Sequence, residues 1–407
     1  MNFLKKAFTC FLILITGLFL FEVSFYFIVP VYNFPRPEPF KGKNLYNPYE
    51  GMDKNCWRKV NFHFHTRAWG GITSGRQNTN ELFWETYKKL GYDAPFISNY
   101  QQISKFNKDS AFYIPVYEHG FGIRKKHQVC IGAKKVLWFD LSLFQDLDHK
   151  QFILDLLRDD NEIVAIAHPG WDNGYPPEHL KYLTNYNLLE VLDNNYRSVE
   201  LWDSALSNGH PVFILADDDA HNIHDPFEIG RCCTFINAPS VHSKDLIRSL
   251  KSGKAYGADI FMYDRETFED KAVNAKQIAW LTDFLLSHDT IWLSLTEKAM
   301  NIRFVGQNGK VMENLWFTEK GFYKFRPDDT YIRTEIILFN KKFDAGSKLY
   351  LNPVFRYDGD QPINPLKAEV NRSRTWIFRI LSFSSVIIIL VPGLYFRRKQ
   401  IQKRKLK

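Results

Sequence analysis

The chain has 407 residues, of which 45% are hydrophobic, 16% aromatic and 24% charged, and its formal net charge at pH 7 is +8. These fractions are typical of a globular protein, and the length favours about two to three structural units. Most of the excess positive charge lies in segment 397–407, which has seven Lys and Arg residues and no acidic residue. The rest of the chain is close to neutral and has no basic stripe, which argues against a nucleic-acid partner.

The first predicted element is an almost wholly apolar segment over residues 7–29, which contains Glu22 and is preceded by Lys5 and Lys6. Such a segment is either a signal peptide or an uncleaved membrane anchor. No small-residue cleavage pattern follows it, so the sequence favours the transmembrane anchor. Residues 33–55 contain closely spaced prolines and are predicted to form an extended linker.

Residues 56–260 alternate between short apolar runs and helical patterns. The predicted strands are Val60–His65, Ala94–Ser98, Phe112–Glu118, His127–Ala133, Ile163–His168, Leu188–Leu192, Val212–Asp217 and Thr234–Ile236. The predicted helices are one that starts within residues 78–81 and ends at Leu90, then Asp148–Arg158, Glu178–Thr184, Val199–Ser207 and Ser243–Lys251. This alternation predicts an α/β fold with a mostly parallel sheet. An irregular α/β barrel fits better than a doubly wound sheet, because no glycine-rich phosphate-binding turn follows the first strand.

The pattern changes in the C-terminal third. Apolar and polar residues alternate over residues 285–360 with turn signals between the runs, which predicts a small antiparallel β domain in a supporting or partner-contacting role. No catalytic cluster is evident in this region.

A second transmembrane helix is predicted over residues 376–396. The part 380–396 has no charged residue and spans about 25 Å as a helix. Trp376 and Tyr395 suit the two membrane interfaces, and a basic tail follows directly. A buried core helix is the alternative. The positive residues at both ends predict a two-pass protein with cytoplasmic termini and with residues 33–375 outside the cytoplasm.

Side chains that bind metal ions recur where the predicted strands end. His63 and His65 alternate within one strand, so they point to the same face and can hold one cation. The later members are Glu118, His127, His168, Asp219 and His221. A barrel gathers its strand ends around one mouth, so these side chains are expected to meet there. Imidazole and carboxylate are suitable ligands for Zn, Mn or Fe.

These motifs resemble those of the PHP (polymerase and histidinol phosphatase) superfamily. The segment Asn61-Phe62-His63-Phe64-His65-Thr66 resembles the first motif, Ala167-His168-Pro169 the third, and Asp219-Ala220-His221 the fourth. Glu118 and His127 match the glutamate and histidine of the second motif. The resemblance covers roughly residues 57–257. It implies a distorted (β/α)7 barrel, a two- or three-metal site and, as in many members, hydrolysis of phosphoesters.

The resemblance also implies a role for each of these residues. One metal ion would be bound by His63, His65, Glu118 and Asp219. The second would be bound by His127, His168 and the shared Glu118. The expected cofactors are therefore two divalent ions, and two cations about 3.5–4 Å apart can activate water and neutralise a phosphoryl transition state.

The chain departs from the superfamily pattern at the third metal. Members with three metals have further histidines where this chain has Ala-Trp-Gly-Gly at 68–71 and Ser-Asn-Tyr-Gln at 98–101. The sequence therefore predicts a two-metal site, in which His221 acts as a catalytic general acid or orients the substrate. Tyr100 or Asn99 is a candidate for binding a substrate oxygen.

Other residues are weaker candidates. Glu190 ends a predicted strand and is a candidate for supporting a metal ligand from behind, and Arg67, Arg124 and Arg231 are candidates for binding phosphate. Within the run Asp217–Asp219, one or two side chains are expected to be solvated or to cap a helix. The five cysteines show no disulfide spacing and are expected to be free.

The leading functional hypothesis is a membrane-anchored, metal-dependent phosphoesterase. Its partners would be the lipid bilayer and a phosphorylated small-molecule or envelope-associated substrate. The alternative is a non-catalytic domain that binds metal or ligand and relays the signal to the membrane segments. Hydrolysis of an amide bond at the same metals stays open. The presence of all the two-metal ligands favours an enzyme.

Overall fold

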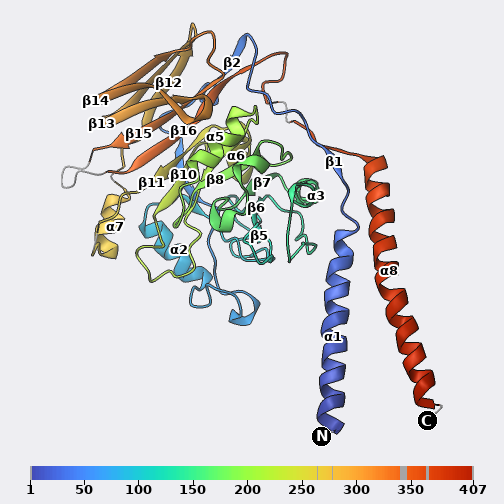
Figure 1. The fold of residues 1–407 in the computed structure, drawn as a ribbon. Coiled ribbons are helices and arrows are strands. Elements are labelled where there is room, and N and C mark those ends of the chain that lie inside the picture. Colours follow the sequence, from blue (N-terminus) through green and yellow to red (C-terminus); the bar gives the residue numbers. More distant parts are fainter. Residues whose placement is uncertain (1, 264, 277, 340–345, 364–365, 406–407) are drawn as a thin grey trace.

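Figure 1 shows the computed structural model, which describes the whole chain except residues 1, 264, 277, 340–345, 364–365 and 406–407. Among the described residues, seven short strands form a ring. They are β3 (Trp57–Asn61), β4 (Ala94–Pro95), β5 (Val116–His119), β6 (Gln128–Ile131), β7 (Ile163–Ile166), β8 (Leu188–Leu192) and β9 (Phe213–Ala216). Almost every side chain in these strands is buried, so burial of their apolar residues stabilises the ring.

The ring is closed by two isolated bridges rather than by continuous pairing. Strands β5 to β9 form one sheet in chain order, and β3 pairs with β4 in the other. Phe64 bridges to Ala220 just beyond the ends of β3 and β9, and Tyr100 bridges to Glu118 in β5. The ends of β3, β5 and β9 therefore meet at one mouth, where several candidate metal ligands lie.

The strand directions confirm the prediction of a mostly parallel sheet only in part. The pairs β3–β4, β7–β8 and β8–β9 are parallel, but β6 is antiparallel to both β5 and β7. The physical reason is the short connection from β5 to β6 over residues 120–127. A parallel pair requires a crossover of about a dozen residues or more, so this connection can only make a hairpin.

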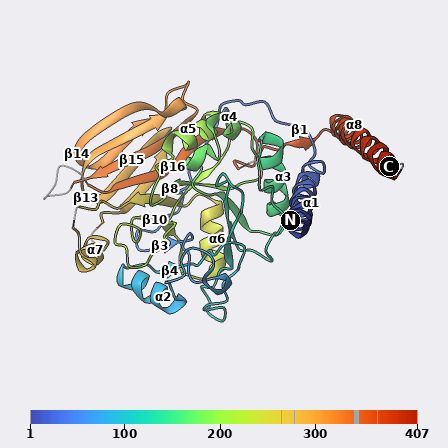
Figure 2. The ribbon, with the colours of Figure 1, turned by 60° about the horizontal axis from the view of Figure 1, so that its bottom comes forward.

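Helices cover the outside of the ring (Figure 2). They are α2 (Asn80–Lys89), α3 (Leu147–Arg158), α4 (Pro177–Leu180), α5 (Val199–Ser207) and α6 (Ser243–Lys251). α2 begins after Thr79, whose side chain accepts a hydrogen bond from the backbone N–H of Leu82 and so satisfies one free donor of the first turn. It buries Phe83 and Tyr87. The predicted helices agree with these bounds to within a few residues at most ends.

A large antiparallel sheet continues from the ring. β10 (Cys232–Asn237) pairs with β3 and leads through β11 (Ala255–Asp259), β16 (Lys348–Tyr357), β15 (Tyr331–Leu338) and β13 (Thr290–Gly306) to β12 (Leu281–Ser287). β14 (Lys310–Lys324) pairs with β13, and β2 (Asn44–Tyr46) pairs with β16. The smaller elements are α7 (Phe268–Asn274) and the 3₁₀ turns η1 (Trp69–Gly71), η2 (Trp171–Asn173) and η3 (Gln307–Gly309). The predicted antiparallel strands are present, in a sheet continuous with the ring.

A buried ion pair ties this sheet to the ring. Arg333 in β15 donates two hydrogen bonds of 2.7 Å to the Asp203 carboxylate in α5. The Tyr331 hydroxyl donates a third to Asp203 at 2.9 Å. Arg333 is 2% exposed and Asp203 6% exposed. Arg333 also pairs with Glu335, so it is removal of Arg333 that would leave the buried Asp203 without an ion-pair partner.

The two terminal helices leave the globular part side by side. β1 (Tyr32–Asn33) pairs with β17 (Glu369–Val370), and these short strands connect to α1 (Asn2–Tyr26) and α8 (Arg372–Lys405). Both helices extend from the same side of the molecule (Figure 1).

Within the described part of the chain, one helix is long and apolar enough to cross a membrane, over Phe3–Tyr26, and its apolar side chains are exposed. The predicted second span, residues 376–396, falls within α8, but many of its side chains lie outside the described residues. The two-pass topology is therefore not supported by the structure.

Candidate metal centre

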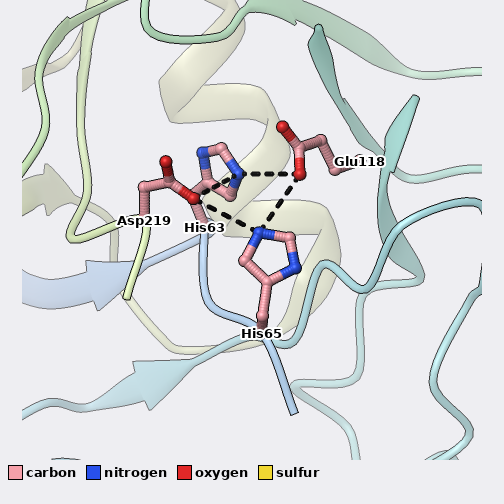
Figure 3. A group of neighbouring side chains, drawn as sticks. All are labelled: His63, His65, Glu118 and Asp219. Carbon is pink, nitrogen blue, oxygen red and sulfur yellow. Dashed lines mark ion pairs between the residues drawn. The ribbon is translucent and has the colours of Figure 1, made fainter. Parts of the chain in front are cut away.

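Four buried side chains converge at the mouth of the ring (Figure 3). His63 and His65 follow β3, Glu118 lies in β5, and Asp219 follows β9. His63 Nε2 lies 3.4 Å from Glu118 Oε2 and 3.2 Å from Asp219 Oδ1. His65 Nε2 lies 3.1 Å from Glu118 Oε2 and 3.2 Å from Asp219 Oδ1. None of the four is more than 2% exposed.

The atoms at the centre of this group have no hydrogen-bond partner. They are His63 Nε2, His65 Nε2, Glu118 Oε2 and Asp219 Oδ1. A buried polar atom without a partner is unfavourable by about 1–3 kcal/mol, so four that point at one spot are not expected by chance. Two imidazole nitrogens and two carboxylate oxygens are suitable ligands for a divalent metal. The residues therefore fit a metal ion at this position.

A second group shares Glu118 with the first. Its other carboxylate oxygen, Oε1, lies 2.6 Å from His127 Nδ1 and 3.1 Å from His168 Nε2. His127 precedes β6 and His168 follows β7, and both are buried. Two buried groups of His, Glu and Asp thus meet at one bridging carboxylate, which is consistent with a binuclear metal site.

The backbone is left-handed at two of these residues. His168 has a φ of +26° and Asp219 a φ of +47°, a region that side chains other than glycine rarely adopt. Each such residue costs about 1–3 kcal/mol, and strained residues of this kind cluster at functional sites. The left-handed conformation turns the chain away from the directions of β7 and β9, so that the His168 and Asp219 side chains reach the centre.

Glu190 in β8 supports two candidate ligands from behind. Its Oε1 accepts a hydrogen bond from His63 Nδ1 at 2.9 Å, and its Oε2 accepts one from the backbone N–H of His168 at 2.7 Å. With Nδ1 as the donor, His63 presents the lone pair of Nε2 to the centre. This arrangement agrees with the supporting position predicted for Glu190.

His221 lies beside the first group rather than within it. Its ring stacks on His65 at a centroid distance of 4.2 Å. His221 Nδ1 lies 2.9 Å from the backbone oxygen of Asp219, and His221 Nε2 lies 3.3 Å from the Tyr100 hydroxyl. These contacts fit a tautomer in which Nδ1–H donates to Asp219 and the Tyr100 hydroxyl donates to Nε2.

Ionisation favours cation binding at the two carboxylates that face the centre. Burial alone would raise the pKa of Glu118, but His127 and His63 hold it well below its usual value. Burial would likewise raise the pKa of Asp219, and His63 and His65 lower it. Both side chains are therefore ionised at neutral pH. Burial and the charge of His65 lower the pKa of His221 to about 4, so in the metal-free protein His221 is a neutral acceptor.

Three further carboxylates, those of Asp217, Asp218 and Asp193, are buried near the centre. All of Asp217, Asp218 and Asp219 are buried, which corrects the prediction that one or two are solvated or cap a helix. Asp218 accepts from the backbone N–H of Gly230, Arg231 and Cys232, so it fixes the chain after β9. Asp193, which is buried beside Glu190, had no signal in the sequence. Burial and the charge of Glu190 raise the pKa of Asp193 to about 7.

The remaining candidate residues lie outside the two groups of metal ligands. The Asn99 side chain accepts from the backbone N–H of Thr66 at 2.8 Å, so it fixes the loop after β3. Arg231 lies 3.5 Å from the carboxylate of Asp259, outside the group of candidate ligands. Arg67 and Arg124 are exposed in the loops that follow β3 and β5. All five cysteines are free, as predicted; Cys130, Cys232 and Cys233 are buried, Cys10 is exposed and Cys56 is partly exposed.

No protein-family model matches the chain, and no curated protein matches it. Among solved structures, the chain is similar to a two-domain protein from Bacteroides vulgatus that contains a predicted PHP-like metal-dependent phosphoesterase. The identity is 14%, the TM-score is 0.37, and the match covers 78% of this chain and 99% of that chain. A likeness at this TM-score carries no argument, so the metal centre rests on its own geometry.

Proposed function

We propose that the chain is a metal-dependent hydrolase that acts on phosphoester bonds at a two-metal centre. The observation that supports this proposal is the shared Glu118, whose two oxygens face two different groups of buried ligands. When bound, two divalent ions such as Zn, Mn or Fe supply Lewis acidity to phosphoryl oxygens and make water more acidic.

The residues of the site would have three roles: binding the metal ions, orienting a metal ligand and orienting the substrate. His63, His65 and Asp219 would hold one ion, His127 and His168 the other, and Glu118 both. Glu190 keeps the His63 ring in the tautomer that presents Nε2 to the ion. The His221 side chain is 25% exposed, so the centre is open to solvent on this side. His221 and Tyr100, hydrogen-bonded to each other at this open side, would orient the substrate. The neutral His221 is suited to accept a hydrogen bond from the substrate.

The test compares metal content and turnover in the full-length protein in detergent. The protein is stripped of metal, reloaded with Zn, Mn or Fe, and assayed with phosphomonoesters, phosphodiesters and an amide substrate. We expect phosphoester turnover in the wild type, loss of turnover and metal in His65→Ala, and no change in His288→Ala, an exposed histidine on the β12–β13 turn. Bound metal without turnover of any ester would contradict the hydrolase and favour a ligand-binding role.

We also propose that α1 and α8 anchor the protein in a membrane. The exposed apolar surface of α1 supports this, as does the contact of α8 with the segment that follows α1. Arg379 in α8 donates a 2.7 Å hydrogen bond to the backbone oxygen of Ile28, and Thr375 accepts from the backbone N–H of Val31. Carbonate extraction of cell membranes tests the anchoring, and release of the full-length chain into the supernatant would contradict it.

A further inference from the structure

Exposed apolar side chains gather on three loops beside the metal centre. We call them the apolar rim, and its members are Trp69, Ile72, Phe121, Ile123, Trp138 and Phe144. Ile72 is 89% exposed, Ile123 71% and Trp138 61%. Large exposed apolar side chains that lie together mark an interaction surface, whereas single ones are ordinary.

The three loops are bound to one another. The rings of Trp69 and Trp138 pack edge to face at 5.6 Å, which joins the loop after β3 to the loop after β6. The backbone N–H of Ile123 donates to the backbone oxygen of Ser142 at 2.9 Å, which joins the β5–β6 loop to the same segment. The rim is therefore one structured surface.

The apolar rim is continuous with the outer end of α1. The Tyr26 ring stacks on Phe144 at 4.5 Å, and the Tyr26 hydroxyl accepts from the backbone N–H of Leu143 and Phe144. One turn earlier in α1, Glu22 accepts from the Ser142 hydroxyl at 2.7 Å. When α1 lies in a bilayer, these contacts hold the loop over residues 137–146 at the bilayer surface.

The same rim reaches the candidate metal centre. Trp69 Nε1 donates a 2.9 Å hydrogen bond to the backbone oxygen of Tyr100, whose hydroxyl contacts His221. The loop that carries Phe121 and Ile123 begins after Glu118 and ends at His127. The rim therefore borders the open side of the centre.

The charge of the rim fits an anionic surface. The loop over residues 66–78 contains Arg67 and Arg76, and the loop over residues 120–126 contains Arg124 and Lys125 together with a buried Lys126; neither loop has an acidic residue. The third loop, over residues 132–146, is balanced, with two lysines and two aspartates. Trp and basic side chains together are typical of protein surfaces at the headgroup region of a membrane. Basic residues near such a surface each gain about 1 kcal/mol from anionic lipids.

The overall arrangement puts the rim on the membrane side. α1 and α8 extend downward from the right of the globular part, and β5 lies in its lower half (Figure 1). The antiparallel sheet with β12 to β14 lies at the far end. A bilayer that holds α1 would thus lie away from the antiparallel sheet and next to the loop over residues 137–146, which Glu22 and Tyr26 contact.

We propose that the apolar rim contacts the bilayer and that the substrate of the metal centre is the phosphorylated headgroup of a membrane lipid. This inference rests on the proposed hydrolase function and on the proposed anchoring of α1. The rim would seat the loops among the lipid headgroups, and the basic side chains would attract an anionic headgroup to the open side beside His221 and Tyr100.

The bilayer contact is tested without any turnover. Full-length protein is reconstituted in vesicles whose lipids are brominated in the upper acyl chain, and quenching of tryptophan fluorescence is measured. We expect quenching to fall in Trp69→Phe/Trp138→Phe and to stay at the wild-type level in Trp280→Phe/Trp292→Phe, a comparably exposed pair on the antiparallel sheet. Equal quenching in wild type and in Trp69→Phe/Trp138→Phe would overturn the contact.

The substrate class is tested by comparing two kinds of ester. The metal-loaded protein is assayed on vesicles that contain phosphatidic acid or phosphatidylglycerol, and on a water-soluble phosphoester. Charges in the rim weaken its insertion, so Ile72→Asp/Ile123→Asp is expected to lower the ratio of vesicle rate to soluble rate about tenfold. Leu285→Asp/Val311→Asp on the antiparallel sheet is the matched control and should leave this ratio unchanged.

The two proposals fail in different ways. Turnover of the soluble ester with no turnover of either vesicle lipid would overturn the lipid substrate and leave the hydrolase intact. Absence of turnover on every ester would overturn the hydrolase and the lipid substrate together, and the quenching experiment would still decide the bilayer contact.

Discussion

Replacement of Glu190 by glutamine isolates the support behind the metal centre. Glu190 is fully buried, and its two oxygens accept from His63 Nδ1 at 2.9 Å and from the backbone N–H of His168 at 2.7 Å. The amide side chain introduced by Glu190→Gln has one acceptor oxygen, so its NH₂ group must face one of these two donors. One candidate ligand then loses its supporting hydrogen bond.

The size of the effect follows from these contacts. A hydrogen bond to a charged group contributes about 1.5–3 kcal/mol. In Glu190→Gln, part of this stabilisation is lost from the metal-bound protein. Loss of such a supporting carboxylate typically lowers metal affinity about 10–100-fold. We therefore expect Glu190→Gln to weaken metal binding by a factor in that range, with helix and strand content unchanged.

The assay is a competition titration. Metal-free full-length protein in detergent is titrated with Zn or Mn against a chromophoric chelator, and circular dichroism confirms the fold. Glu335→Gln, a strand glutamate in β15 away from the centre, is the matched control. An affinity in Glu190→Gln within about twofold of the wild type, with an intact fold, would refute the reasoning.

Three further predictions concern stability and turnover. Asp203→Ala removes two hydrogen bonds from the buried Arg333, which keeps Glu335 as its remaining carboxylate partner. It is expected to lower the free energy of unfolding by about 3 kcal/mol, measured by urea unfolding; a loss below about 1 kcal/mol would contradict the buried pair. Burial lowers the pKa of Lys150 from 10.5 to about 7, so between these pH values the unfolded chain holds more protons and stability rises with pH. Lys150→Met is therefore expected to raise the free energy of unfolding at pH 7 by about 2–4 kcal/mol, and this gain should shrink toward pH 10.5; a gain that does not depend on pH would contradict the assignment. Tyr100→Phe removes the donor to His221 and is expected to lower kcat at least about tenfold with metal content unchanged, so loss of metal would show that Tyr100 acts on the ligands instead.

The candidate ligands were predictable because their spacing is local and their strands are strongly apolar. His63 and His65 come directly after a buried strand, and the residue pair Asp219 and His221 follows another. The extent of the first strand was overestimated: β3 ends at Asn61, because the following residues leave the ladder so that the histidines reach the centre. The end of such a strand is therefore set by the metal-ligand positions of the residues that follow it, and not by their intrinsic strand propensity.

Other features depend on contacts between distant parts of the chain and had no local signal. β11, α7 and β12 were not predicted, and β11 is a short strand over Ala255–Asp259 that contains glycine and is fixed by pairing with β10 and β16. The burial of Asp218 depends on backbone N–H groups that follow it by more than ten residues. The apolar rim is visible only when the three loops are brought together.

The shared Glu118 is the central claim, and electron paramagnetic resonance of the manganese-loaded full-length protein tests it most directly. Two Mn ions that share one carboxylate are magnetically coupled, whereas separate ions give the spectrum of isolated Mn. We expect a coupled spectrum in the wild type with two Mn per chain, and an isolated-ion spectrum in His168→Ala, which weakens one of the two positions. An isolated-ion spectrum in the wild type at two Mn per chain would contradict a centre bridged by Glu118.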